Sequence, residues 1–149
     1  MNIGIIGCGL IGKKRAKSIP AVHSIAGVCD IQASRADELA QMTGCRFVTD
    51  DYKELIGQPG LDLVVVSTLN NQLAPITLYA VEHGKHVIVE KPGGICSAEL
   101  LPVMKAAQKN HLLVKVGFNH RYHPAMQKEK ELMQTDKTGD VMIIRASYG

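Results

Sequence analysis

A glycine-rich loop near the N-terminus is the first feature of this sequence that could support chemistry. The residues GCGLIG, beginning at Gly7, have the spacing G-x-G-x-x-G and directly follow the apolar run NIGII. In that context Gly7 permits a tight turn, Gly9 lets a pyrophosphate approach the main chain, and Gly12 lets the next helix pack closely on the strand. The helix start, at Leu10 and Ile11, offers free N–H groups to phosphates. The loop predicts a dinucleotide-binding site; an ordinary glycine-rich turn is the alternative.

A carboxylate, Asp30, stands 18 residues after Gly12, at the end of the second apolar run. An acid in this place accepts hydrogen bonds from the hydroxyls of the adenosine ribose. It would repel a 2′-phosphate about 4 Å away by roughly 1 kcal/mol in water and about 4 kcal/mol at an effective dielectric of 20. The sequence therefore predicts NAD as the cofactor, with NADP disfavoured. Arg35 could instead bind a 2′-phosphate, although a solvated helix charge explains it equally well.

Six short apolar runs rich in Val and Ile alternate with amphipathic segments of helical length. This pattern is typical of repeated strand–helix–strand units, which build a parallel sheet. The runs LDLVVVS and HVIVE are apolar almost throughout, as expected for central strands with helices on both faces. We predict an α/β fold: a doubly wound parallel sheet (Rossmann) of six strands in the order 3-2-1-4-5-6. The expected strands are 2–6, 25–29, 46–48, 63–67, 86–89 and 112–117.

Turn and capping residues set the expected helix boundaries. Ser34, with Asp37 three residues later, resembles a capping box for the second helix. Pro75 suits a first helical turn, and Gly84 suits the position just after a helix. Ser97 is the expected N-cap of the helix that follows the fifth strand.

Composition and charge are typical of one soluble globular domain. The chain has 149 residues, of which 46% are hydrophobic and 21% charged, and a formal net charge of +3. A mild basic balance without a concentrated patch gives no reason to expect a nucleic-acid partner. No apolar run approaches the roughly 18 residues of a membrane span, and the N-terminus lacks the features of a signal peptide. We therefore expect a cytoplasmic protein with no membrane partner.

The cysteines and histidines do not form a metal-binding pattern. The four cysteines contain no C-x-x-C pair and have no histidine at ligand spacing, so we expect reduced thiols and no metal. His120 and His123 lack a third ligand at suitable spacing. The cations of KKRAK, at 13–17, are interpreted as the solvated face of a helix, where they add to a field that favours an anionic dinucleotide.

The end of the sequence does not fit the six-stranded sheet. A loop, HRYHP, and a charged helix near 124–135 precede the apolar run GDVMIIRASYG. Residues 140–148 have a strand pattern, but the predicted sheet is already complete, and an exposed apolar strand invites aggregation. We therefore predict a dinucleotide-binding Rossmann domain over 1–122. The remainder, 123–149, would be a C-terminal overhang: a connecting helix and the first strand of a missing second domain.

Three later segments carry a more specific pattern: LDLVVVSTLNNQ, AVEHGKHVIVEKP and VGFNHRYHP, in which E-K-P after the fifth strand is the most specific motif. In these segments the chain resembles the glucose-fructose oxidoreductase and inositol dehydrogenase superfamily, usually called Gfo/Idh/MocA. The resemblance implies an NAD-dependent oxidoreductase that transfers a hydride between nicotinamide and an alcohol of a sugar, polyol, sugar acid or nucleotide sugar. It also implies a second, substrate-binding α/β domain and, at full length, a homo-oligomer.

The resemblance implies roles for the residues of two motifs. Lys91 of E-K-P would be the catalytic residue, touching the substrate and polarising the reacting oxygen or relaying its proton. A surface lysine in a turn is the alternative. Glu90 would bond the nicotinamide ribose, and Pro92 would follow a cis peptide bond. Asn119 and Arg121, after the sixth strand, would reach the substrate, where Arg121 suits a carboxylate or phosphate.

The same resemblance implies cofactor contacts after the fourth strand. Ser67, Thr68 and Asn70 would lie beside the cofactor at the carboxyl end of that strand. The usual proline after the threonine is Leu69 here, and the histidine often found shortly afterwards is Leu73. These departures put in doubt any role that depends on those two positions.

A function of a different class stays open, namely a non-catalytic NAD-binding module. In this interpretation the missing domain leaves a chain that binds NAD without turnover. We expect the 149-residue chain alone to be inactive in either case, because the principal proton-transfer residue would lie in the missing domain.

Overall fold

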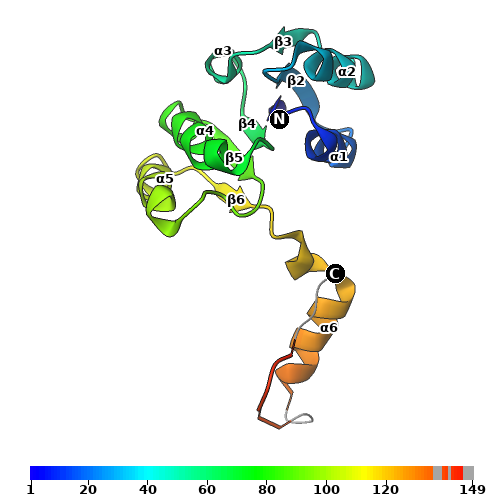
Figure 1. The fold of residues 1–149 in the computed structure, drawn as a ribbon, viewed down its shortest axis with the longest axis vertical. Helices are drawn as coiled ribbons and strands as arrows, with labels where there is room; N and C mark the ends of the chain where they lie inside the picture. The colour runs from blue at the N-terminus through cyan, green and yellow to red at the C-terminus, as the bar shows by residue number, and fades with distance from the viewer. Residues whose placement is uncertain (136–138, 141, 146–149) are drawn as a thin grey trace. The chain divides into compact units, whose positions relative to one another are not determined.

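The computed structural model describes residues 1–135, 139–140 and 142–145. The chain forms two compact units, Met1–Gly117 and Phe118–Gly149. Strands and helices alternate along the first unit (Figure 1). They are β1 (Asn2–Ile6), α1 (Leu10–Ser18), β2 (Ser24–Cys29), α2 (Ala33–Thr43), β3 (Phe47–Thr49), α3 (Tyr52–Ile56), β4 (Leu63–Val66), α4 (Asn70–Glu82), β5 (His86–Val89), α5 (Ser97–Lys109) and β6 (Val114–Val116).

The first unit contains a six-stranded sheet in the order β3-β2-β1-β4-β5-β6, and all its neighbouring strands are parallel. In the register at its centre, Ile5 of β1 pairs with Val28 of β2 on one side and with Val65 of β4 on the other. Parallel neighbours need a crossover connection, which the intervening helices supply. The predicted doubly wound Rossmann sheet, with its strand order, is confirmed.

Two hydrophobic cores cover the two faces of the sheet, as side chains alternate along each strand. Val64 and Val66 of β4 pack in one core with Leu73 and Ile76 of α4, and α3 and α5 add to the same core. Val65 points into the other core, which α1 and α2 close. Burial on both faces accounts for the uninterrupted apolar run of β4.

The start of α2 differs from the sequence prediction. The helix begins at Ala33, and its N-cap is Gln32, whose side chain makes no capping bond. The predicted capping box of Ser34 and Asp37 is therefore wrong. The Asp30 carboxylate already accepts the N–H of Gln32 at 2.9 Å, and this bond turns the chain into the helix two residues earlier.

The boundaries of α4 confirm one prediction and correct another. Gly84 follows the helix with a φ of 76°, as predicted for a glycine just after a helix end. Pro75 lies inside α4 and not in its first turn, because the helix begins five residues earlier, at Asn70. Pro75 has no N–H and so cannot make one of the hydrogen bonds of the helix. Burial of the α4 side chains that follow Pro75 stabilises the helix despite this loss.

The start of α5 lies one residue before the predicted position. Ser97 is the first helical residue, and the N-cap is Cys96, without a side-chain capping bond. Instead, the Glu99 carboxylate accepts the N–H of Ile95 at 2.8 Å and fixes the chain before the helix. The predicted cap at Ser97 is therefore wrong by one position.

The second unit contains a short 3-10 helix, η1 (Asn119–Tyr122), and a longer helix, α6 (Pro124–Met133). The His123 side chain accepts the N–H of Ala125 at 3.3 Å, and Pro124 fits the first helical position, where its missing N–H costs nothing. The predicted charged helix near 124–135 is confirmed.

Only part of the segment predicted as the first strand of a missing domain is described, at 140 and 142–145, and that part is unpaired in this chain. Residues 142–145 have no strand conformation, and Ile143 and Ile144 are exposed. A strand needs backbone partners on a neighbouring strand, and among the described residues none pairs with 142–145. Residues 141 and 146–149 of the predicted strand lie outside the described residues, and the domain boundary at 122 stays a prediction.

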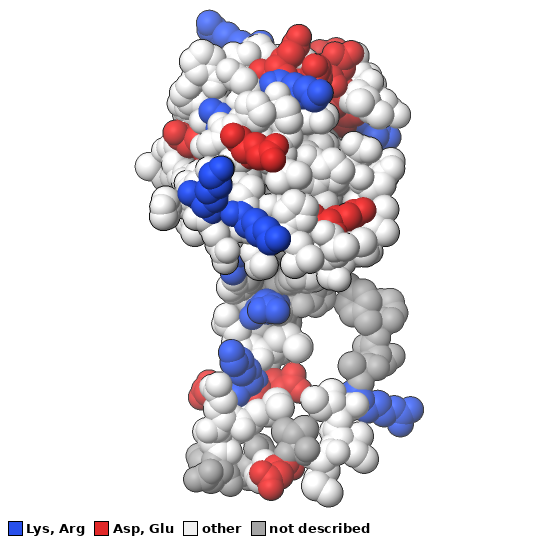
Figure 2. Space-filling model, turned by 90° about the vertical axis from the view of Figure 1, so that its left-hand side faces the viewer, with Lys and Arg blue, Asp and Glu red and all other residues white. Residues whose placement is uncertain are grey.

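The surface carries charges of both signs. In the view of Figure 2, Lys and Arg side chains and Asp and Glu side chains of the first unit are interspersed among uncharged residues. Within the described ranges, none of the helices is both long and apolar enough to cross a membrane.

Candidate functional site

The glycine-rich loop joins β1 to α1 at the carboxyl edge of the sheet. Gly7 has a φ of +91°, and a Cβ there would lie 2.5 Å from the carbonyl oxygen of Ser67. At Gly12 a Cβ would lie 2.0 Å from the carbonyl oxygen of Gly7. The main chain at both positions is too close for any side chain, so these glycines build the turn itself.

Gly9 differs from the other two glycines because it faces open space. A Cβ at Gly9 would meet no atom within 4 Å. Gly9 is also the N-cap of α1 and has no side chain to satisfy the first N–H groups of that helix. A helix start with free N–H groups beside open space suits an anion such as the diphosphate of a dinucleotide.

Asp30 directly follows β2 and lies beside the loop. One carboxylate oxygen accepts the N–H of Cys8 at 2.7 Å, and the other accepts the N–H of Gln32 at 2.9 Å. The side chain is largely buried, with the residue 8% exposed. A carboxylate can accept about four hydrogen bonds, so capacity for ribose hydroxyls remains. Arg35 is exposed in the first turn of α2.

The loop cysteine belongs to the core. The Cys8 thiol donates to the carbonyl oxygen of Cys29 at 3.4 Å, and all four cysteines are free. Burial, with a smaller effect of the Asp30 charge, raises the pKa of Cys8 to about 12. Burial likewise raises the pKa of Cys29 to about 12. Both thiols therefore stay protonated at neutral pH and serve packing.

One of the residues after β4 forms a hydrogen bond with the glycine-rich loop. The Ser67 hydroxyl donates to the carbonyl oxygen of Gly7 at 2.7 Å. The hydroxyl oxygen of Thr68 is buried and has no hydrogen-bond partner in the described part of the chain. Asn70 is exposed and opens α4. Ser67 thus holds the glycine loop in shape, which is a contribution that the motif alone does not reveal.

The E-K-P segment directly follows β5. Lys91 is exposed, and the peptide bond between Lys91 and Pro92 is cis, as predicted. Glu90, by contrast, turns inward: its side chain is 12% exposed and forms an ion pair with Arg15 of α1. The Nε and Nη2 groups of Arg15 both donate to Oε1 of Glu90.

The prediction that the basic cluster of α1 is simply a solvated helix face is wrong for two of its members. Lys13 pairs with Glu38 of α2 at 2.5 Å, and Arg15 pairs with Glu90. Lys14 and Lys17 are exposed, as predicted. The sequence does not show that Arg15 is the partner of Glu90, because that pairing depends on how α1 packs against β5.

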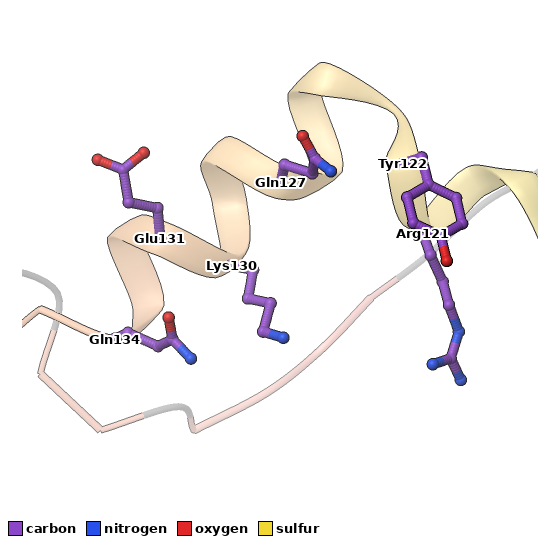
Figure 3. A pocket seen from close by; sticks show the side chains of 6 residues that line it. All are labelled: Arg121, Tyr122, Gln127, Lys130, Glu131 and Gln134. Atoms are coloured by element: carbon purple, nitrogen blue, oxygen red, sulfur yellow. The ribbon is translucent and has the colours of Figure 1, made fainter.

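Two of the predicted substrate residues, Asn119 and Arg121, lie in the second unit. Arg121 places its guanidinium 5.9 Å from the centre of the Phe118 ring, and Asn119 opens η1. Arg121 and Tyr122 also line a shallow hollow of about 460 Å³, together with residues of α6 and its end (Figure 3). That Asn119 and Arg121 bind substrate stays a prediction.

The remaining predicted residues meet at one edge of the first unit. They follow β1, β2, β4 and β5, which are neighbours in the sheet, so their strand ends share one edge. Ligands of doubly wound sheets bind at this edge, where the strand order reverses. The residues are Gly7, Gly9, Leu10, Ile11, Gly12, Asp30, Arg35, Ser67, Thr68, Asn70, Glu90 and Lys91.

The sequence matches a known family over the same part of the chain. The profile of the Gfo/Idh/MocA family, described as "Oxidoreductase family, NAD-binding Rossmann fold", matches residues 1–118. The chain belongs to this family. The resemblance seen in the sequence motifs is therefore confirmed.

Relatives in the Gfo/Idh/MocA family include several dehydrogenases. The chain is 30% identical over 144 residues to the uncharacterized oxidoreductase YrbE of Bacillus subtilis, covering 95% of this chain and 42% of that protein. It is 27% identical over 154 residues to inositol 2-dehydrogenase of Salmonella typhimurium, covering 99% and 46%. The chain thus spans less than half the length of these curated relatives.

Solved structures of similar proteins have the same fold. The UDP-N-acetylglucosamine 3-dehydrogenase GnnA of Acidithiobacillus ferrooxidans superposes with a TM-score of 0.80 at 30% identity, over 89% of this chain and 43% of that one. A scyllo-inositol dehydrogenase of Lactobacillus casei, solved with bound NAD(H) and scyllo-inositol, has a TM-score of 0.87 at 22% identity, over 94% and 42%. The second similarity concerns the fold alone.

Proposed function

We propose that the carboxyl edge of the first unit binds NAD and serves an oxidoreductase that acts on a sugar, polyol, sugar acid or nucleotide-sugar alcohol. The open space at Gly9, beside the uncapped start of α1 and the Asp30 carboxylate, carries this proposal. The named activities of the family relatives support the substrate class, and in the L. casei structure NAD(H) is the bound cofactor.

Asp30 makes NAD the preferred cofactor over NADP in this proposal. Its two backbone bonds fix the carboxylate in place, and its remaining acceptor capacity suits the two ribose hydroxyls. A 2′-phosphate in the same place would meet a fixed negative charge, at a cost of roughly 1 to 4 kcal/mol. Arg35 is too exposed to offset much of that cost.

Calorimetric titration of the chain tests the cofactor preference. We expect NAD⁺ to bind about ten- to a thousandfold more tightly than NADP⁺, which converts the 1 to 4 kcal/mol at 1.4 kcal/mol per decade. Asp30→Asn should narrow the preference to less than about tenfold, because the repelling charge is gone while an acceptor remains. Asp37→Asn, which removes an exposed carboxylate of α2, is the matched control. Equal or tighter binding of NADP⁺ by the unchanged chain would refute the assignment.

Lys91 is the catalytic residue of the proposal. Bound NAD would supply the acceptor or donor of a hydride. The Lys91 ammonium group, exposed at the same edge, would stabilise the negative charge that develops on the reacting oxygen. Glu90 would orient the nicotinamide ribose, and Asn119 and Arg121 would bind the polar groups of the substrate. The position of Lys91, exposed directly after β5, supports this role.

We expect the 149-residue chain by itself to bind NAD without turning over a sugar or polyol. Hydride transfer needs a substrate held at near-attack distance, which is worth about 7 to 11 kcal/mol in favourable cases. At the cofactor edge of the first unit, Lys91 is the proposed substrate contact, and one contact cannot supply that hold. Absorbance of NADH during incubation with NAD⁺ and inositol measures the outcome. A cytoplasmic location and a homo-oligomeric state stay predictions.

A further inference from the structure

The ion pair between Arg15 and Glu90 joins parts of the chain that are 75 residues apart. Arg15 lies on α1, the helix whose start forms the candidate phosphate site. Glu90 follows β5 and directly precedes Lys91. The pair therefore connects the phosphate end of the candidate site to the end that carries the proposed catalytic lysine.

The geometry of the pair leaves part of the carboxylate available. Arg15 donates from Nε and Nη2, and both groups go to Oε1 of Glu90, so Arg15 does not take up Oε2. The backbone N–H of Glu90 donates to the carbonyl oxygen of Val66 at 2.9 Å, which fixes the residue as a continuation of the sheet. One oxygen is thus held by a cation on a fixed backbone, while the other can accept a hydrogen bond.

Gly117, directly after β6, lies against the ion pair of Arg15 and Glu90. A Cβ at Gly117 would lie 3.2 Å from Nη2 of Arg15 and 3.4 Å from both carboxylate oxygens of Glu90. The absence of a side chain at Gly117 therefore leaves the room that the guanidinium occupies. The backbone N–H of Gly117 donates to the carbonyl oxygen of Val89 at 2.8 Å, so the position of Gly117 is fixed by a hydrogen bond to β5.

The burial of the pair makes Glu90 dependent on Arg15. The side chains are 30% exposed for Arg15 and 12% for Glu90. A carboxylate as buried as this needs a compensating partner, and removing the partner leaves an uncompensated charge that must move or take up a proton. Lys14, one residue earlier on α1, is exposed and carries the same charge, which makes it a suitable comparison.

We propose that Arg15 is a positioning residue, which holds the Glu90 carboxylate so that Oε2 accepts a hydroxyl of the nicotinamide-side ribose. This inference rests on the proposed NAD site. Arg15 would thus promote binding of the nicotinamide-side ribose and not of the diphosphate, although it lies on the helix whose start is the candidate phosphate site. Loss of Arg15 should therefore weaken only those ligands that carry this second ribose.

Three ligands of increasing length separate the contribution of the diphosphate to binding from that of the second ribose: ADP, ADP-ribose and NAD⁺. The 149-residue chain and its variants are titrated with each by calorimetry. We expect Arg15→Met to weaken ADP-ribose and NAD⁺ about ten- to thirtyfold and ADP less than threefold. Lys14→Met, which removes one exposed charge from α1, should weaken all three ligands by the same small factor.

A double-variant cycle shows whether Arg15 acts through Glu90. Glu90→Gln should weaken ADP-ribose and NAD⁺ about as much as Arg15→Met does. In the Glu90→Gln background, the further change Arg15→Met should cost less than threefold, because the carboxylate that Arg15 positions is already gone. The double variant also removes both charges, so it keeps the test valid if Arg15→Met alone does not fold.

The outcomes distinguish the inference from the proposed function. If the unchanged chain binds neither NAD⁺ nor ADP, the proposed function fails. If it binds both and Arg15→Met weakens ADP as much as NAD⁺, Arg15 acts on the phosphates and the positioning role is wrong. Additive effects of Arg15→Met and Glu90→Gln on NAD⁺ affinity would also overturn it.

Discussion

Replacing Gly9 with alanine should abolish tight NAD binding without unfolding the chain, whereas the same change at Gly12 should destabilise the fold. A Cβ at Gly9 enters open space, and the backbone there is extended, so the folded state tolerates it. The methyl group would occupy the space where a pyrophosphate approaches the main chain. We expect NAD⁺ affinity to fall at least about tenfold, or about 1.4 kcal/mol, with the Tm nearly unchanged.

The comparison with Gly12→Ala makes this prediction specific. At Gly12 a Cβ would lie 2.0 Å from the carbonyl oxygen of Gly7, and the backbone must move to admit it. We expect a loss of about 3 kcal/mol or more of unfolding free energy, the upper range for overpacking. At about 2–4 °C per kcal/mol, this lowers the Tm by about 6–12 °C. Calorimetric scans and NAD⁺ titrations of both variants measure the two effects.

Loss of stability in Gly9→Ala, with loss of NAD⁺ affinity but normal stability in Gly12→Ala, would refute the roles assigned to the two glycines. NAD⁺ binding of normal strength by Gly9→Ala would show that no ligand approaches the loop at that point. Gly44→Ala provides a control for a glycine with positive φ outside the site, since φ is +70° there and nothing lies within 4 Å of its Cβ. We expect Gly44→Ala to lower the free energy of unfolding by about 1 kcal/mol and to leave NAD⁺ affinity unchanged.

Replacing Lys91 with alanine should lower the turnover number about a hundredfold or more in the polypeptide that shows dehydrogenase activity. Lys91 is exposed directly after β5, at the edge where the candidate cofactor residues meet. Removal of one group that acts on developing charge typically costs 10²- to 10³-fold in rate. NAD⁺ affinity should change little, because the expected effect falls on the transition state.

Steady-state kinetics and NAD⁺ titration together test the role of Lys91. Lys105→Ala, which removes an exposed lysine of α5, is the matched control and should have normal turnover. A Lys91→Ala variant with near-normal turnover would remove Lys91 from the chemistry. The E-K-P segment would then be only a structural turn.

The fold of the first unit could be predicted because local sequence signals and tertiary burial agree there. The apolar run of β4 is buried on both faces, and that of β5 is buried on one face and partly buried on the other, so their composition indicates central strands. The short edge strands β3 and β6 are only partly buried, and their predicted ends differ from the observed ones by one or two residues. Helix starts were less predictable, because backbone bonds to Asp30 and Glu99 replaced the expected caps.

The candidate site could be predicted only where one short segment contains the whole signal. The glycine spacing with Asp30, and the E-K-P motif, are such segments, and the structure brings them to one edge of the sheet. The pairing of Arg15 with Glu90 depends on which side of α1 faces β5, and the sequence does not specify that packing. The support of Gly7 by Ser67 is a tertiary contact of the same kind.

The measurement that most directly tests the proposed site is a titration of the 149-residue chain with NAD⁺, in which NMR records the chemical shift of each backbone amide. We expect the largest shifts in the glycine loop, from Gly7 to Gly12, with further shifts at Asp30 and Glu90. Gly60 and Gly84, which precede β4 and β5 at the opposite edge, should shift little. Saturable binding with its largest shifts at that opposite edge, or no shifts at millimolar NAD⁺, would show that the glycine loop does not bind NAD.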